Sequence, residues 1–205
     1  MTAKSPEPSG LIGIVSFPVE VLGPGKRVGI WFQGCHQRCA GCISPHSHEF
    51  DESRRVPLSD MSRKLAMFQL FTDKITISGG EPFAQPEFLF AVLQVAREKG
   101  FRDILVYSGL SRQTIEETVP EPLSLIDVLI DNPFDSSLPT RLVWRGSANQ
   151  NFHILTADPK VREQYEVHRD RCEEQPSVQI LQAEGKTVVA GIPRGGSYLP
   201  ADFLD

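Results

Sequence analysis

The sequence predicts an α/β fold, a partial and open barrel with a mostly parallel sheet and a C-terminal β-hairpin. Short runs rich in β-branched residues alternate with helical patterns along most of the chain, which is typical of parallel strands joined by crossover helices. The helical segments provide four crossovers, too few for a complete eightfold barrel. The last two β-rich runs flank Glu-Gly-Lys at 184–186, which indicates a hairpin.

The first half of the chain carries the following signals. Gly-Pro-Gly at 23–25 is a turn that separates strands predicted at 12–17 and 27–32. Apolar residues at helical spacing predict a helix over 59–71. The β-branched run that follows predicts a strand over 74–78.

Helix-start signals organise the second half. The helix predicted over 86–99 has proline at its first position and glycine just past its end. Ser111 is a plausible N-cap for a helix over 111–118, and Pro159 suits the first turn of a helix over 158–168. The remaining strands are predicted at 103–107, 128–131, 151–155, 177–183 and 187–192.

Length and charge narrow the class of protein. A chain of 205 residues predicts one domain, here 10–205, preceded by a disordered lead over 1–9. The net charge of -5 disfavours a nucleic-acid-binding protein. The apolar stretches are far shorter than the roughly 20 residues that span a bilayer, and residues 1–9 lack a secretory signal. We therefore expect a cytoplasmic protein with no membrane or nucleic-acid partner.

Three of the four cysteines lie within eight positions of each other, directly after the second predicted strand. In a reducing compartment such a cluster indicates a metal site rather than disulfides. Cys35, Cys39 and Cys42 are one thiolate short of the four that a closed iron–sulfur cluster takes, so a cubane held by them has one open iron. The alternative is a structural zinc site in which His46 is the fourth ligand.

The spacing Cys-x3-Cys-x2-Cys resembles the signature of the radical S-adenosylmethionine (SAM) superfamily. Residues 75–82, Ile-Thr-Ile-Ser-Gly-Gly-Glu-Pro, look like the Gly-Gly-Glu motif at the end of the next strand in these enzymes. Further segments resemble the activating protein of anaerobic ribonucleotide reductase, within the glycyl-radical activating enzyme group: 106–109, 128–134, 144–150 (Trp-Arg-Gly-Ser-Ala-Asn-Gln) and 191–195. The resemblance implies a shortened (βα)6 radical SAM barrel.

The resemblance also implies two cofactors, a [4Fe-4S] cluster and SAM. Cys35, Cys39 and Cys42 would ligate the cluster, and the SAM amino and carboxylate groups would chelate the fourth iron. The SAM amino group would be received by Gly79, Gly80 and Glu81.

Four later residues are further candidates for the SAM pocket. Ser108 and Asp131, at the ends of later strands, would line it, and Asn149 would make a polar contact. Arg145 would pair with the SAM carboxylate, because a guanidinium matches that group in a fork geometry. The alternatives are a helix cap or loop carboxylate for Asp131 and a surface ion pair for Arg145.

The implied activity is reductive cleavage of SAM to a 5′-deoxyadenosyl radical, which installs a glycyl radical on a partner protein such as anaerobic ribonucleotide reductase. No side chain abstracts an unactivated hydrogen, so no catalytic residue is expected beyond the cluster and SAM. The electron would come from an external donor of the flavodoxin or ferredoxin type. The alternatives are radical SAM modification of a peptide or small metabolite, and a zinc-stabilised binding module. The chain departs from typical reductase activators after the third cysteine, where Ile43 replaces an aromatic residue.

Overall fold

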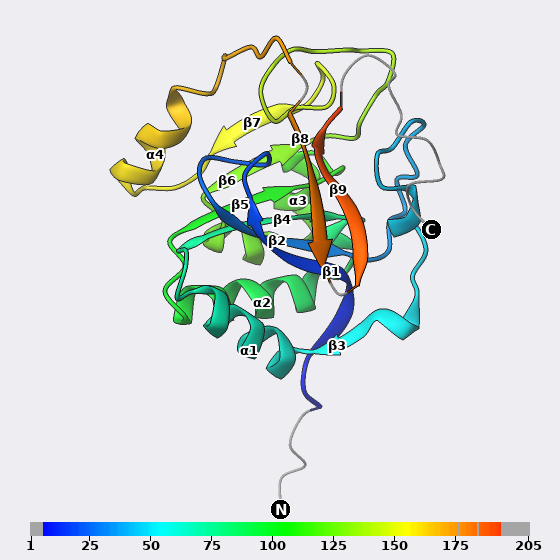
Figure 1. Ribbon diagram of the computed structural model, residues 1–205, viewed down its shortest axis with the longest axis vertical. Helices are drawn as coiled ribbons and strands as arrows, with labels where there is room; N and C mark the ends of the chain where they lie inside the picture. Colours follow the sequence, from blue (N-terminus) through cyan, green and yellow to red (C-terminus); the bar gives the residue numbers. More distant parts are fainter. Residues whose placement is uncertain (1–5, 176, 184, 194–205) are drawn as a thin grey trace, which may run out of the picture.

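A seven-stranded sheet in the order β3-β1-β2-β4-β5-β6-β7 forms the centre of the protein (Figure 1). The computed structural model describes residues 6–175, 177–183 and 185–193. The strands of this sheet are β1 (Ser9–Val19), β2 (Arg27–Phe32), β3 (Arg55–Pro57), β4 (Lys74–Gly79), β5 (Asp103–Tyr107), β6 (Val128–Asp131) and β7 (Asn151–Ile154). A separate hairpin pairs β8 (Ser177–Ala183) with β9 (Lys186–Ile192).

The four inner strands β2, β4, β5 and β6 run parallel, and β1, β3 and β7 pair antiparallel at the two sides. The parallel strands are joined through α1 (Leu58–Phe68), α2 (Pro86–Glu98) and α3 (Arg112–Thr118). The mostly parallel central sheet and the C-terminal hairpin are thus confirmed. The fourth expected crossover passes through α4 (Pro159–Glu166) but leads to the separate hairpin instead. The (βα)6 barrel stays a prediction.

Helices α1, α2 and α3 cover one face of the sheet. Their buried side chains, such as Met61, Leu93 and Ile115, pack against the strand residues Ile30 and Ile77 in the largest apolar cluster. Side chains alternate between the two faces of a strand, so the neighbours of these strand residues point to the opposite face. That alternation decides which side chains can reach a site on the face of the sheet away from α1, α2 and α3.

The opposite face is covered by two smaller units. Helix α4 contributes Val161 and Tyr165 to a cluster with Trp144 and Phe152. The β8–β9 hairpin packs Leu181 and other apolar residues against β1 and β2, and Figure 1 shows it crossing in front of the sheet. The Gln179 side chain fastens it to β1: its amide accepts from Glu20 N (2.9 Å) and donates to Pro18 O (2.9 Å).

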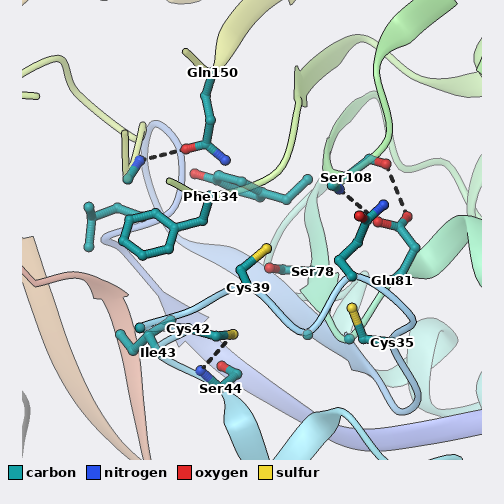
Figure 2. A pocket seen from close by; sticks show the side chains of 18 of the residues that line it. Cys35, Cys39, Cys42, Ile43, Ser44, Ser78, Glu81, Ser108, Phe134 and Gln150 are labelled. Carbon is teal, nitrogen blue, oxygen red and sulfur yellow. Dashed lines mark hydrogen bonds between the residues drawn. The ribbon is translucent and has the colours of Figure 1, made fainter. Parts of the chain in front are cut away.

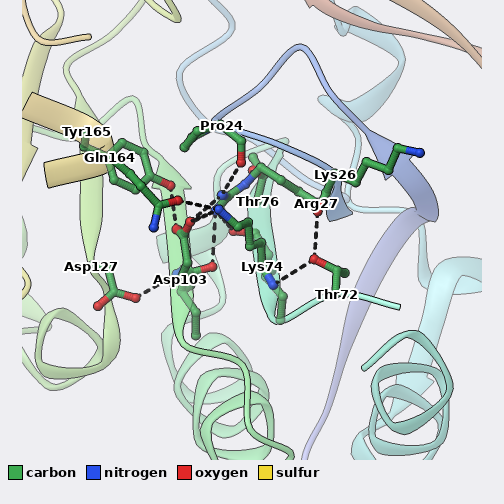
Figure 3. A network of polar contacts seen from close by, with 12 residues as sticks. Pro24, Lys26, Arg27, Thr72, Lys74, Thr76, Asp103, Asp127, Gln164 and Tyr165 are labelled. Atoms are coloured by element: carbon green, nitrogen blue, oxygen red, sulfur yellow. Dashed lines mark hydrogen bonds and ion pairs between the residues drawn. The ribbon is translucent and has the colours of Figure 1, made fainter. Parts of the chain in front are cut away.

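A buried polar network lies at the amino ends of the parallel strands (Figure 3). Arg27, which is fully buried, donates to both carboxylate oxygens of Asp103 at 2.8 and 2.9 Å. The Tyr165 hydroxyl donates to the same carboxylate at 2.5 Å, and Lys74 Nζ lies 3.5 Å from it. A buried charge pair is stable only when its remaining hydrogen-bonding capacity is satisfied. This network therefore ties α4 to the starts of β2, β4 and β5.

The amino-terminal lead differs from the prediction at its end. Residues 1–5 lie outside the described residues, but β1 already begins at Ser9. Before it, Glu7 accepts from Ser59 N and the Pro8 carbonyl accepts from Leu58 N. These contacts satisfy N–H groups in the first turn of α1, which have no partner within the helix. In the part of the chain described, no helix has the length and apolar character needed to cross a membrane.

Candidate metal and cofactor site

The loop that carries the three cysteines leaves the carboxyl end of β2 and is closed by its own hydrogen bonds. Gly34 N donates to Ser47 O at 2.8 Å, and Cys35 N donates to His48 O at 3.0 Å. Gln33 links the ends further, because its side-chain amide donates to the carbonyls of His46 and Glu49. The loop is therefore a folded unit rather than an open connection.

The three thiols line one cavity of about 570 Å³ (Figure 2). Cys35 is buried, whereas Cys39 and Cys42 are half-buried, and all three are free. The other walls come from the ends of β4 and β5, the segment after β6, and the residues of β9. The strand ends and the cysteine loop thus meet where sequence analysis predicted a cluster site.

The electrostatics of the loop disfavour bare thiolates. Burial raises the pKa of the Cys39 thiol, and proximity to Cys35 raises it further. Burial likewise raises the pKa of Cys42, with added repulsion from Cys39 and Cys35, against a hydrogen bond from Ser44 N (3.4 Å). Three neighbouring cysteines would repel one another as thiolates, and a bound cation would stabilise that form, which is the chemistry of a metal site.

The Gly-Gly-Glu segment is joined to the cysteine loop by backbone hydrogen bonds. Gly80 N donates to Phe32 O at 2.7 Å, and Glu81 N donates to Gly34 O at 2.8 Å. A Cβ on Gly80 would stand 2.2 Å from Gly34 O, and one on Gly79 would stand 2.5 Å from Phe32 N and O. The two glycines are needed here because the backbone of the cysteine loop occupies that space, an explanation that the sequence did not suggest.

Glu81 is buried beside the cavity, and its carboxylate already accepts three hydrogen bonds. Phe83 N (3.0 Å) and Ser108 Oγ (3.0 Å) donate to Oε1, and Gly109 N (2.7 Å) donates to Oε2. Burial raises the pKa of Glu81, against these three donors. A carboxylate accepts about four hydrogen bonds, so capacity remains for one donor such as the SAM amino group. That role stays a prediction.

Of the later candidates, Ser108 lines the cavity but Asp131 does not. Ile130 packs with α4 on one face of the sheet. Asp131 is the next residue along the strand, so its side chain lies on the opposite face, which α1, α2 and α3 cover. There it accepts from Arg112 N at the start of α3 (2.6 Å) and lies 3.1 Å from His153 Nε2. The described contacts are those of the helix-cap alternative, and a contact with SAM stays a prediction.

Arg145 and Asn149 also lie outside the cavity lining. The Arg145 guanidinium is buried, stacks 5.6 Å from the centre of the Phe152 ring and donates to the Arg169 carbonyl. Asn149 donates to Pro133 O at 2.8 Å. For Arg145 to bind the SAM carboxylate, its side chain would have to leave Phe152. Its position differs from both interpretations of the sequence, since it is neither at the cavity nor in a surface ion pair.

The cavity is also lined by residues that sequence analysis did not select. Ser78 lies at the end of β4, two positions after Thr76 and on the same face, and Figure 2 shows it beside Cys39. Asn132, Phe134 and Gln150 come from the segment between β6 and β7. Two features of the sequence could have identified these residues. Strand alternation indicates Ser78, and the 128–134 and 144–150 motifs contain Asn132, Phe134 and Gln150.

Comparison with known proteins identifies the family. The family described as "4Fe-4S single cluster domain" matches residues 21–153, which contain all three cluster cysteines and the Gly-Gly-Glu segment. The chain belongs to this family. Among the described residues, no group of three or more His, Cys, Asp or Glu side chains is placed to hold a single metal ion. The family match supports a 4Fe-4S cluster rather than the Cys3His zinc alternative.

Relatives of this 4Fe-4S protein extend the match. It is 34% identical over 147 residues to the anaerobic ribonucleoside-triphosphate reductase-activating protein of Haemophilus influenzae, covering 67% of this chain and 94% of the relative. The Escherichia coli K12 protein of the same name is 28% identical, with 68% and 96% covered. The pyruvate formate-lyase-activating enzyme of Clostridium pasteurianum is 32% identical over 113 residues, and the chain spans about half its length, 48%.

The relatives establish the class of enzyme and its cofactors. The protein is a radical SAM enzyme of the activating type, and its cofactors are a [4Fe-4S] cluster and SAM. Among solved structures, QueE from Escherichia coli matches with a TM-score of 0.44 and 19% identity, over 49% of this chain and 52% of that one. A likeness at that level supports no further conclusion.

Proposed function

We propose that this protein installs a glycyl radical on a partner protein, such as an anaerobic ribonucleotide reductase. The observation that carries the proposal is the similarity to reductase-activating proteins over nearly their whole length. The pyruvate formate-lyase-activating relative supports the same kind of protein substrate, although the chain spans only about half of it. The predicted cytoplasmic location stays a prediction.

The cysteine loop and the strand ends would hold the two cofactors. Cys35, Cys39 and Cys42 would ligate the cluster, leaving one iron for SAM. Together, the bound cofactors supply the hydrogen-abstracting radical chemistry that no side chain performs. Glu81 would accept a hydrogen bond from the SAM amino group, and Ser108 would keep the Glu81 carboxylate in place through its bond to Oε1.

The remaining walls would orient the substrate and exclude water. Leu22, Trp31 and, from the hairpin, Ile192 line the cavity and belong to one apolar cluster. An apolar enclosure limits the access of water to a reactive species, which prevents side reactions. The hairpin therefore has a proposed role in the reaction as well as in packing.

The electron for the cluster would come from outside the protein. The sequence has four cysteines in all, and the fourth, Cys172, is exposed and distant in sequence. One cysteine is too few for a second cluster. We therefore propose an external donor of the flavodoxin or ferredoxin type.

The test is to incubate anaerobically reconstituted protein, SAM and dithionite with the anaerobic ribonucleotide reductase of the same organism. The expected result is a glycyl radical on the reductase, detected by electron paramagnetic resonance, which Cys39→Ala abolishes. Cleavage of SAM without a radical on the reductase would overturn the proposed partner and favour a peptide or small metabolite. If the wild-type protein cleaved no more SAM than Cys39→Ala, the proposed activity itself would be contradicted.

A further inference from the structure

The two faces of the β8–β9 hairpin differ in what covers them. On the inner face, Leu181 and Ala190 are buried in an apolar cluster with Trp31. Side chains alternate along a strand, so Val178 and Ile180 point to the outer face, where they are 46% and 63% exposed. Packing within the part of the chain that the structure describes therefore does not account for the apolar residues of the outer face.

Strand β9 has a free edge beside the cavity. It pairs with β8 alone, and among the residues that the structure describes no backbone hydrogen bond reaches it from outside the hairpin. Residues 189–193 line the cavity, and Figure 1 shows β9 on the side of the hairpin toward the cysteine loop. The edge of a sheet is a template for pairing with another extended chain.

The register of the hairpin shows which backbone groups lie on that edge. Two residues separate Ala183 from its partner Lys186, and the pair that flanks a two-residue loop exchanges hydrogen bonds. Every second residue does the same, and accordingly the Ser177 carbonyl is directed at β9, 2.0 Å from where a Cβ of Gly191 would stand. Val189 occupies an intervening position, so its N–H and C=O point away from β8 to the free edge.

Val189 also joins the outer face to the cavity. It lies opposite Ile180 in the hairpin, so the two side chains share the outer face, and it is part of the cavity lining. The other outer-face side chains near the turn, Gln182 and Thr187, are uncharged. A strand added to β9 would direct alternate side chains toward this uncharged, mainly apolar face and the others toward the cavity.

We propose that the free edge of β9 binds an extended segment of the partner protein as a third strand and thereby directs the residue to be modified into the cavity. Main-chain hydrogen bonds supply the affinity of such an addition, and alternate side chains supply its specificity. The segment is uncharged and carries apolar residues at alternate positions, to match the outer face. The inference rests on the proposed function for the identity of the partner.

Two observations favour a protein segment at this edge. A small substrate enclosed by the cavity would leave the outer face uncovered, whereas a polypeptide that enters past Val189 covers both. A second copy of this chain, or residues 194–205, bound permanently at the same edge would obstruct the cavity. The hairpin also lies beyond residues 21–153, which match the 4Fe-4S family, so it can serve recognition of one partner.

The test measures binding of the anaerobic ribonucleotide reductase of the same organism to the anaerobically reconstituted protein with SAM, by biolayer interferometry. Val189→Pro removes the N–H at the free edge of β9, and the dissociation constant should rise about tenfold. Gln182→Pro is the matched control, because it removes the corresponding N–H from the edge of β8 away from the cavity. It should bind as the wild type does.

A second variant and a second measurement do not depend on proline. Ile180→Asp places a charge on the outer face and should weaken binding about fivefold, whereas Leu70→Asp, at a 77% exposed residue after α1, should not. Bound reductase should also slow hydrogen exchange at the Val189 amide. Iron and sulfide contents equal to the wild type show that each variant is folded.

The outcomes separate this inference from the proposed function. Wild-type affinity and radical yield in folded Val189→Pro would overturn the inference and leave the proposed function standing. Binding that depends on Val189 without a radical on the reductase would do the reverse. Should Val189→Pro fail to hold a cluster, Ile180→Asp and hydrogen exchange decide.

Other occupants of the edge would also overturn the inference. A wild-type dimer in light scattering that Val189→Pro converts to a monomer would assign the edge to a second copy of this chain. Slow exchange at the Val189 amide without reductase, made fast by deletion of residues 194–205, would assign it to the C-terminal segment. The inference expects a Val189 amide that exchanges rapidly until the reductase is added.

Discussion

The two ends of the parallel strands treat buried charge in opposite ways. At the amino ends, Asp103 is surrounded by the donors Arg27 and Tyr165, with Lys74 nearby, and all are built into the fold. At the carboxyl ends, the three cysteines would repel one another as thiolates, and Glu81 forms no ion pair with any residue that the structure describes. One end is electrostatically complete, whereas the proposed cofactors would complete the other.

The comparison shows which end provides stability and which provides function. Burial of Asp103 raises its pKa, but Arg27 and the other donors outweigh burial and hold the pKa below its ordinary value. Burial raises the pKa of Glu81 with backbone and hydroxyl donors alone to oppose it. Perturbed carboxylates beside a cavity are candidates for ligand binding, and those in a satisfied network are structural.

The largest expected effect is at the carboxyl ends. Cys42→Ser should abolish incorporation of the cluster and all cleavage of SAM, because two remaining thiolates do not hold a cubane. Iron and sulfide analysis and a 5′-deoxyadenosine assay measure this. Cys172→Ser, at an exposed cysteine, is the matched control and should retain both. Retention of a catalytically competent cluster by Cys42→Ser would refute the assigned ligand set.

At the amino ends, Asp103→Ala should lower the free energy of unfolding by about 3–5 kcal/mol, because it leaves Arg27 buried without its anion. Urea denaturation of the cluster-free protein measures the change. Arg112→Ala removes an exposed ion pair with Glu116 and should cost under about 1 kcal/mol. Similar losses in the two variants would remove the distinction between a buried network and a surface pair.

A smaller effect is expected for Glu81→Gln. The variant keeps the size of the side chain but replaces an acceptor oxygen by an amide donor, so the affinity for SAM should fall about tenfold, or about 1.4 kcal/mol. Equilibrium dialysis with the reconstituted protein tests this. Glu87→Gln on the exposed side of α2 should bind SAM as the wild type does. Equal affinities in all three proteins would show that Glu81 serves only its internal bonds.

The smallest effect is the pH dependence of the amino-end network. Because the folded-state pKa of Asp103 is lowered, its contribution is fully present above the unfolded value of about 3.9 and is lost as pH falls through the folded value. The difference in unfolding free energy between wild type and Asp103→Asn should therefore shrink on acidification from about pH 5. A difference that stays constant would contradict the ionised pair.

The sequence predicted the parts of the site that lie close together in the chain. The cysteine loop and the Gly-Gly-Glu segment are local patterns that follow strands, so their positions follow from the parallel sheet. Asp131 shows the limit of this reasoning, because one position along a strand reverses the face. Strand alternation, applied to Ile130 and Asp131, would have placed the carboxylate on the helix side.

Contacts between distant segments were beyond the reach of the sequence. Nothing in the neighbourhood of Arg27 indicates that Asp103 and Tyr165 surround it, since pairing of strands and docking of α4 bring them together. Similarly, Phe134 and Cys39 line the same cavity from distant segments, and Phe134 follows the left-handed turn at Asn132. Such contacts follow from tertiary packing rather than from local preference.

The hairpin β8–β9 has one further consequence. Within the described residues, its backbone pairs only with itself, and Gln179 and apolar side chains attach it to β1. Yet Val189 and Ile192 form part of the cavity wall. Substitutions in this hairpin can therefore change the shape of the cavity without removing any backbone hydrogen bond of the seven-stranded sheet.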